Sequence, residues 1–314
     1  MQETYTSKGS NDSDSEINLL ELFYVLLAGK WIIISVTTFV SIISVIYSLL
    51  LPNIYESKAL LVPVNSSVSN TSALRGYSSL AGLAGINLPS GIDTSNSQKA
   101  IKKIYTLSFF ENNILPNIYL PDLMAVKAWN SETNKLVYDK NIYDVDSNAW
   151  VSGYPHMQQQ IPSAQQSYQK FKGHLTLSEG KEYGFISLAI KHQSPLIAKQ
   201  WTELIVNEVN NFYREKDKLE SQKALDYLNE QISLTSLSEI KETIVQLLQE
   251  QTKRLTLIEA NEFYVFDYID PPAVMEKKSE PKRSLICILG TILGGMLSVL
   301  FVLIRHYTKN EKSS

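Results

Sequence analysis

The side chains that most often carry catalysis or bind metals are few and widely spaced in this sequence. Its four histidines are His156, His174, His192 and His306, and its single cysteine, Cys287, lies within a long apolar run. A metal site or a nucleophilic triad needs several such groups at characteristic spacings. No Ser-His-Asp, paired-carboxylate or Gly-x-x-x-x-Gly-Lys-Ser/Thr pattern is recognisable. We therefore predict no catalytic residue, no metal and no cofactor.

The spacing that carries most information is Gly290-x-x-x-Gly294, followed directly by Gly295. Small residues one helical turn apart allow a second helix to approach closely when no water is present to drive association. We therefore expect these three glycines to pack against another helix in a membrane-spanning segment. The alternative is that glycine is simply common in such helices.

Two uncharged apolar runs lie near the ends of the chain, at residues 31–51 and 285–304. About 20 apolar residues span the ~30 Å hydrocarbon core as a helix, and backbone amides in lipid must bond within that helix. Lys30 and Tyr55 flank the first run, as is typical at the headgroup level. A cleaved signal peptide is the alternative, but the run is too long and no small-x-small cleavage site follows it.

These runs predict five regions: residues 1–30, a tail with an amphipathic helix; 31–51, the first transmembrane helix; 52–284, a large domain between the spans; 285–304, the second transmembrane helix; and 305–314, a second tail. Two spans place both tails on one side of the membrane. Basic residues flank the second span on both sides, so the positive-inside count alone is ambiguous. The long central segment is expected to lie outside, because long segments are translocated largely regardless of charge.

The central region mixes strand and helix patterns, so we predict an α+β membrane protein with long helices over residues 195–262. Alternating apolar residues predict strands at 55–64 and 263–269 and a hairpin over 174–191. Apolar residues at helical spacing and capping residues predict helices at 98–115, at 195–231 and from Ser236 or Ser238 to 260. The strands at 55–64 and 263–269 should pair with each other, because each adjoins a membrane span. The aromatic-rich residues 117–170 yield few elements, and their rings pack in a core or line a sugar site.

A nearly continuous charged stretch interrupts the long helix, and it consists of Arg214, Glu215, Lys216, Asp217, Lys218 and Glu220. Such a stretch can bury little within its own subunit, so we expect it to face a neighbouring subunit. A second feature, Pro271, Pro272 and Pro281, precedes the second apolar run. Prolines stiffen the backbone and remove hydrogen-bond donors, so we interpret this linker as positioning the domain at the membrane.

Several motifs occur in an order that resembles one family. They are E-I-N-L-L-E-L-F at 16–23, Y-E-S-K-A at 55–59, S-L-A-G-L-A-G-I at 79–86, S-P-L-I-A-K-Q-W at 194–201, F-D-Y-I-D-P-P at 266–272, and P-K-R followed by G-x-x-x-G-G at 281–295. In this order, framed by two apolar runs, they resemble the Wzz-type chain-length determinants, or polysaccharide co-polymerases of class 1. The glycine-rich 79–86 segment is either a loop facing a neighbour or ligand, or a surface loop.

The resemblance implies an inner-membrane, multi-pass protein with residues 1–30 and 305–314 as cytoplasmic tails and residues 52–284 as a periplasmic domain with an α/β base. It also implies a homo-oligomeric ring among membrane lipids. It implies control of the length of O-antigen or a related polysaccharide made by a separate polymerase, with lipid-linked polysaccharide as a further partner and no catalysis. Only residues 305–314 follow the second span, so no kinase domain is expected. No proline lies between Val274 and Glu280, which departs from the family pattern.

Other classes of protein fit less well. An enzyme lacks a recognisable constellation of residues, a two-span sensor lacks an output domain, and a net charge of -3 gives no basic footprint for nucleic acid. An accessory protein of capsule or exopolysaccharide assembly and export remains the alternative function.

Overall fold

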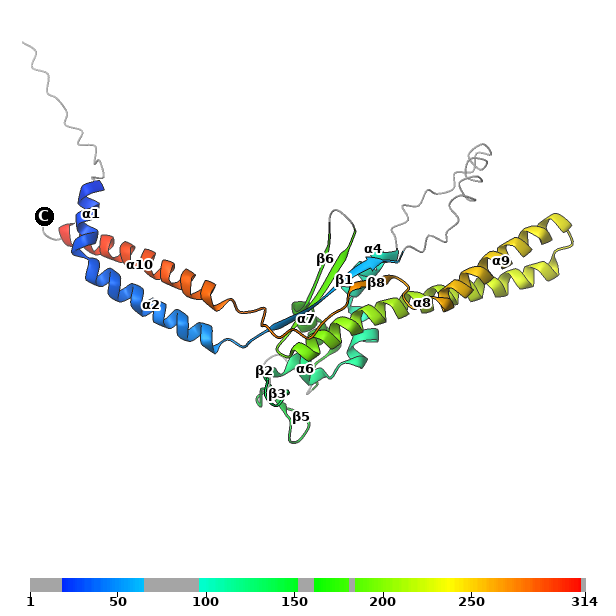
Figure 1. Ribbon diagram of the computed structural model, residues 1–314, viewed down its shortest axis with the longest axis horizontal. Helices are drawn as coiled ribbons and strands as arrows, with labels where there is room; N and C mark the ends of the chain where they lie inside the picture. The colour runs from blue at the N-terminus through cyan, green and yellow to red at the C-terminus, as the bar shows by residue number, and fades with distance from the viewer. Residues whose placement is uncertain (1–18, 65–95, 152–160, 181–183, 312–314) are drawn as a thin grey trace, which may run out of the picture. The chain divides into compact units, whose positions relative to one another are not determined.

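The structure is a computed structural model that describes residues 19–64, 96–151, 161–180 and 184–311. The chain divides into two units, Met1–Leu51 with Pro281–Ser314, and Pro52–Glu280. Helices and strands occur together (Figure 1), as the predicted fold class requires. The glycine-rich segment 79–86 lies outside the described residues.

The described residues of the first unit form the helices α1 (Leu19–Ala28), α2 (Lys30–Leu50) and α10 (Arg283–Glu311). The segments Lys30–Leu50 and Arg283–His306 are each long and apolar enough to cross a membrane. Helices α2 and α10 lie side by side (Figure 1), and they run antiparallel. Large apolar side chains such as Phe39 and Leu297 are exposed on the outside of this pair.

Gly29 separates α1 from α2. A Cβ atom at Gly29 would lie 2.5 Å from Cγ1 of Val302 on α10. The glycine therefore gives α10 room to pack at the junction of the two other helices.

The second unit is built on a four-stranded antiparallel sheet with the order β6-β7-β1-β8. Its strands are β1 (Tyr55–Pro63), β6 (Leu175–Glu179), β7 (Ile186–His192) and β8 (Phe266–Asp270). The predicted hairpin is confirmed as β6–β7. The predicted pairing of the strand at 55–64 with the strand at 263–269 is confirmed as β1–β8. Both ends of this unit also meet, because Ile54 N donates to Glu280 O at 2.9 Å.

Helix α8 (Pro195–Leu234) covers one face of the sheet and forms the centre of the core. The alternation of β1 turns Ala59 and Leu61 inward, where both are fully buried. Ile205, Val206 and Val209 of α8 are also fully buried. The core is completed by side chains from the shorter helices: Ala100, Ile104, Phe109, Phe110, Ile114 and Phe171.

The prediction of one helix over residues 98–115 is wrong. The structure has α4 (Asn96–Ile104), then α5 (Leu107–Phe109), a π-helical turn η1 (Phe110–Ile114) and a 3-10 turn η2 (Leu115–Asn117). The break occurs because the Thr106 hydroxyl donates to Lys103 O at 2.7 Å and accepts from Phe109 N at 3.3 Å. A threonine that bonds its own backbone in this way ends one helix and caps the next.

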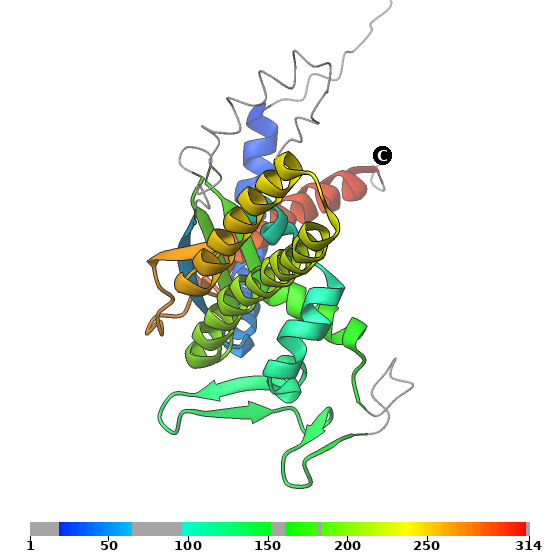
Figure 2. The same cartoon turned by 90° about the vertical axis from the view of Figure 1, so that its right-hand side faces the viewer.

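The long helix is confirmed, and it ends at Leu234, three residues beyond the predicted end. Its 40 residues correspond to a length of about 60 Å. Helix α9 (Ser238–Ala260) returns beside it (Figures 1 and 2). Neither Ser236 nor Ser238 caps α9, since Leu237 holds the N-cap position without a side-chain bond. We call residues 214–234 of α8, together with α9, the helical arm.

The aromatic-rich region contains short elements that sequence patterns did not resolve. They are α6 (Leu120–Met124), β2 (Val126–Asn130), β3 (Lys135–Tyr138), β4 (Tyr143–Asp144), β5 (Ala149–Trp150) and α7 (Ala164–His174). Helix α7 begins with a capping box between Ser163 and Gln166. This Ser-x-x-Gln spacing was a readable start signal that the sequence analysis missed.

Candidate functional site

Two of the four histidines meet in the core of the second unit. His174 and His192 have ring centroids 5.9 Å apart, and both lie beside Trp201. His192 donates from Nε2 to Asp122 O, and its Nδ1 accepts from Ser194 N, both at 3.0 Å. Burial lowers the pKa of His192 to about 4. The neutral ring thus joins β7, α6 and the start of α8, which is a structural role.

Within the described ranges, no three His, Cys, Asp or Glu side chains come together in a way that could hold a metal ion. The rings of the aromatic-rich region pack mainly on one another: Tyr143 is buried and contacts Tyr119, Tyr138 and Trp150. Of the two interpretations of these rings, core packing fits this arrangement.

The glycines of α10 face α2 of the same chain. A Cβ at Gly290 would lie 1.9 Å from Oγ of Ser44, and one at Gly294 would lie 2.8 Å from Cβ of Val40. Gly295 is different, because its nearest neighbour, Oγ1 of Thr37, is 4.0 Å away. Two of the three predicted glycines are therefore required for this close approach, and Gly295 has room for a methyl group.

The partner surface on α2 is a row of small hydroxyl side chains that the sequence analysis missed. Its members share one helix face through spacings of four, three and four residues: Thr37, Ser41, Ser44 and Ser48. Ser41 and Thr291 hydroxyls hydrogen-bond at 3.0 Å, and Thr37 and Ser298 hydroxyls lie 3.4 Å apart. Glycines and hydroxyls thus pair α2 with α10, and the hydroxyl spacing was visible in the sequence.

The interpretation that the charged stretch of α8 has no partner within its own chain is wrong for three residues. Asp217 is only 6% exposed; it accepts from the Tyr264 hydroxyl at 2.5 Å and lies 3.5 Å from the Arg254 guanidinium. Lys218 forms an ion pair of 2.5 Å with Glu259, and Arg214 donates to the carbonyls of residues 261 and 262. Burial and the Asp217 carboxylate raise the pKa of Tyr264. This face of α8 therefore holds α9.

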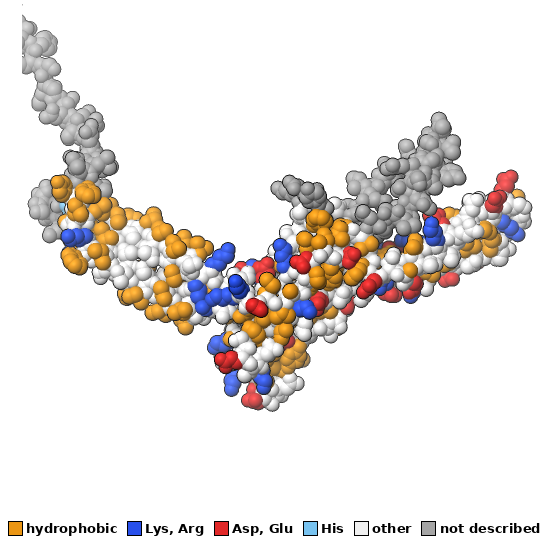
Figure 3. Space-filling view, viewed as in Figure 1, with side chains coloured by type: hydrophobic (Ala, Val, Ile, Leu, Met, Phe, Trp, Pro, Cys, Tyr) orange, Lys and Arg blue, Asp and Glu red, His pale blue; other side chains and the backbone are white. Residues whose placement is uncertain are grey.

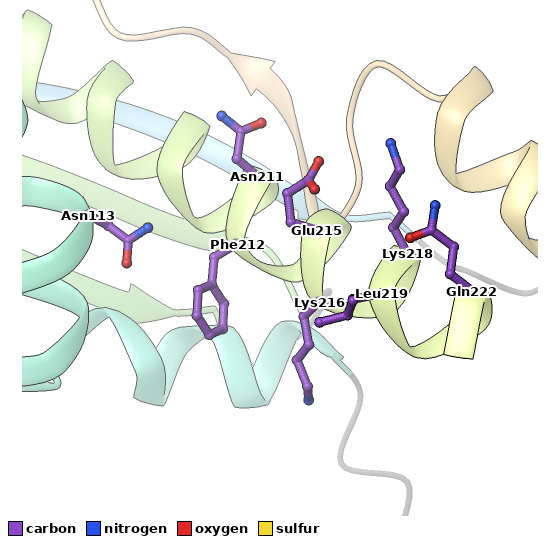
Figure 4. A pocket seen from close by; sticks show the side chains of 8 residues that line it. All are labelled: Asn113, Asn211, Phe212, Glu215, Lys216, Lys218, Leu219 and Gln222. Atoms are coloured by element: carbon purple, nitrogen blue, oxygen red, sulfur yellow. The ribbon is translucent and has the colours of Figure 1, made fainter. Parts of the chain in front are cut away.

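The remaining charged residues of the stretch, Glu215, Lys216 and Glu220, are exposed, and Lys216 pairs with Glu220 at 3.7 Å. They adjoin an open groove along α8 with a volume of about 560 Å³. Figure 4 shows its lining side chains: Asn113, Asn211, Phe212, Glu215, Lys216, Lys218, Leu219 and Gln222. Leu219 is 52% exposed in it. The groove combines apolar side chains with charges and amides.

The proline linker is fastened to the sheet rather than loosely extended. Pro271 and Pro272 follow β8 directly and, lacking N–H groups, cannot continue its ladder. The Ser57 hydroxyl instead donates to Ala273 O at 2.9 Å. Farther along, Lys191 lies 2.5 Å from the Glu280 carboxylate. The chain thus stays beside β1 until Glu280, where the second unit ends.

The two units differ in the side chains that they expose. The α2–α10 pair is covered largely by apolar side chains, whereas mixed charges cover the helical arm (Figure 3). Along the arm, several large apolar side chains are nonetheless exposed: Leu219, Tyr227, Leu234, Leu237, Ile240 and Leu247.

Together, the paired apolar helices and the mixed domain define a class of protein: a helix-and-sheet body whose two ends lead into apolar helices. Residues 15–106 match the Wzz family model, described as "Chain length determinant protein". Residues 231–307 match the GNVR model, described as "G-rich domain on putative tyrosine kinase". The resemblance to the Wzz-type chain-length determinants is thereby confirmed, and the chain carries their Wzz domain.

Solved structures that match this chain include two polysaccharide co-polymerases. One, a "full-length bacterial polysaccharide co-polymerase", is 14% identical; the match covers 95% of this chain and 100% of that one, with a TM-score of 0.41. The other, a "Fragment of WzzB, Polysaccharide Co-polymerase from Salmonella Typhimurium", is 12% identical over 73% of this chain and 100% of that one, with a TM-score of 0.26. At these values the likeness supports no inference about function. No curated protein matches the chain.

Proposed function

We propose that this chain regulates the chain length of O-antigen or a related surface polysaccharide by acting as an oligomeric scaffold for a separate polymerase. The observation that carries the proposal is the match of residues 15–106 to the chain length determinant model. The match includes the first apolar helix and β1. The chain itself makes and breaks no bond of the polymer and uses no cofactor.

In the proposed topology, α2 and α10 cross the inner membrane, residues 1–30 and 305–314 lie in the cytoplasm, and residues 52–284 lie in the periplasm. The antiparallel α2–α10 pair supports this arrangement, since two spans return the chain to its starting side. Gly290 and Gly294 then serve packing within the bilayer, where small residues allow close helix contact. Pro271, Pro272 and Pro281 hold the periplasmic domain at the membrane surface.

Subunits associate through the outward face of the helical arm. The groove beside Glu215, Lys216 and Leu219 supports this role, because it combines apolar side chains with charges of both signs. Such a surface is suited to another copy that carries the same mixture. The assembly then brings the polymerase and its lipid-linked polysaccharide into a defined arrangement, and the geometry of the assembly sets the polymer length.

A role in capsule or exopolysaccharide assembly and export is the second candidate. The match of residues 231–307 to the GNVR model favours keeping it. A deletion strain and a size-resolved gel of its surface polysaccharide discriminate between the two functions. Length control predicts that polymer is still exported but loses its modal lengths, and complementation restores them. Loss of surface polymer altogether would instead support export, and an unchanged ladder would contradict both functions.

A further inference from the structure

One face of α8 carries buried or partly buried polar side chains at positions 210, 214 and 217. This i, i+4, i+7 spacing places them in one row along the helix. Asn210 is 4% exposed and Asp217 is 6% exposed. Polar groups in such positions must find hydrogen-bond partners, and all three find them in the segment from Asn261 to Phe266, which leads from α9 into β8.

Asn210 makes the most specific of these contacts. Its Oδ1 accepts from Val265 N at 2.8 Å and from Phe266 N at 2.9 Å, and its Nδ2 donates to Phe266 O at 2.9 Å. Val265 O accepts from Val64 N, beside β1, so the neighbouring Phe266 groups point to the opposite side of β8. The Asn210 amide therefore bonds the outer edge of β8 as a fifth strand would.

The two other side chains hold the same segment one and two turns farther along α8. The Arg214 guanidinium donates to Asn261 O at 2.8 Å and to Glu262 O. Asp217 accepts from the Tyr264 hydroxyl at 2.5 Å. These are directional contacts, whereas apolar packing permits small slides and rotations. They therefore define the angle at which α8 leaves the sheet and enters the helical arm.

The geometry points to a length-setting device: we propose that Asn210, supported by Arg214 and Asp217, fixes the direction of the helical arm relative to the sheet, and that this direction determines the modal polymer length. The second part rests on the proposed function. In an assembly of identical subunits, a change in arm direction is repeated in each copy and alters the spacing between neighbouring arms. Asn210 is accordingly a specificity-determining residue, acting by positioning without contact to polymer.

The direction of the arm can be measured without reference to polymer. Cysteines replace exposed Thr176 on β6 and exposed Asn229 on α8 in a full-length Cys287→Ser background, and each receives a spin label. Labelled protein is diluted with unlabelled protein, so that only distances within one chain are detected by pulsed electron resonance. The parent should give one narrow distance distribution.

Asn210→Leu retains approximate size but leaves Val265 N, Phe266 N and Phe266 O without their partner. We expect a broader and displaced distance distribution and a shifted modal length in a complemented deletion strain. Asn207→Leu is the matched control, since Asn207 is exposed on the same helix, and it should change neither quantity. Arg214→Met provides a second, milder variant with a smaller displacement, should Asn210→Leu not accumulate.

The outcomes separate the two parts of the proposal. An unchanged distance distribution in Asn210→Leu, or in Arg214→Met where the first variant does not accumulate, overturns the positioning role. A displaced arm with an unchanged modal length overturns the length-setting role. If deletion of the gene leaves the polymer ladder unaltered, the proposed function fails, whereas the distance measurement still decides the positioning role of Asn210.

Discussion

Gly290 of α10 lies directly against Ser44 of α2, so that a methyl group at Gly290 would come within 1.9 Å of the Ser44 hydroxyl oxygen. The two helices contact closely because neither position carries a large side chain. This contact joins segments that are far apart in the sequence, and it brings the two apolar helices of one chain together. Its consequences can be tested one residue at a time.

Gly290→Ala should destabilise the α2–α10 pair, because the added methyl group must displace Ser44. Overpacking of this kind costs about 1–3 kcal/mol. Thermal unfolding of the detergent-purified chain should show a lower midpoint for this variant. Gly295→Ala is the control, since its nearest neighbour is 4.0 Å away. Ser44→Gly should partly rescue Gly290→Ala; equal midpoints for the two alanine variants would count against the contact.

Asp217→Ala should destabilise the junction of α8 and α9. It leaves the half-buried Tyr264 hydroxyl without its acceptor and removes the Arg254 ion pair. An unsatisfied buried group costs about 1–3 kcal/mol, and urea unfolding of the purified chain measures the loss. Glu220→Ala is the control, because its exposed pair with Lys216 contributes at most about 1 kcal/mol. A larger loss in Glu220→Ala would contradict the assignment.

Acid should destabilise the second unit through His192. Burial holds its pKa at about 4, below the value of 6.5 expected in the unfolded chain. Its contribution is therefore complete above pH 6.5 and is lost as pH falls towards 4, amounting to roughly 3 kcal/mol. Thermal unfolding midpoints between pH 7.5 and 4.5 measure this slope. His192→Gln should be less stable at pH 7.5 yet show a shallower slope, and an unchanged slope would refute the role of His192.

Lys191→Met should loosen the end of the proline linker. Lys191 lies 2.5 Å from the Glu280 carboxylate and 3.9 Å from that of Glu56, and Glu280 raises the pKa of Lys191. Trypsin should then cut severalfold faster at the exposed Lys277, in line with a partly exposed pair contributing about 0.2–1 kcal/mol. Lys199→Met, which removes a pair along α8 alone, is the control. Equal cleavage rates in the two variants would show that the linker is held by other contacts.

Much of the sheet was predictable because its strands have strong local patterns. The hairpin over residues 174–191 alternates on both arms around glycines, and the pairing of β1 with β8 followed from their position beside the two apolar runs. Pro195 and the apolar period of α8 likewise predicted the long helix. These features depend on residues close together in the sequence or on one topological constraint.

The contacts that fix the candidate surfaces were not predictable in this way. Asn210 hydrogen-bonds Val265 and Phe266, which lie 55 and 56 positions farther along the chain. No local pattern distinguishes an asparagine that bonds a strand edge from an exposed one. The charge of Asp217 predicted that its side chain is exposed. In the structure the Asp217 carboxylate is buried, because the Tyr264 hydroxyl and the Arg254 guanidinium pair with it. Thr106 broke an otherwise regular helical period by bonding its own backbone, a local competition that apolar periodicity does not register.

The central claim is that the chain acts by assembling with itself. Light scattering of the full-length, detergent-purified protein after size exclusion, corrected for bound detergent, measures its mass directly. We predict a stable multimer of the 35.5 kDa chain that dissociates when Leu219→Asp places a charge on the exposed apolar side chain of the groove. A protein that remains monomeric across the accessible concentrations would contradict the scaffold and the function built on it.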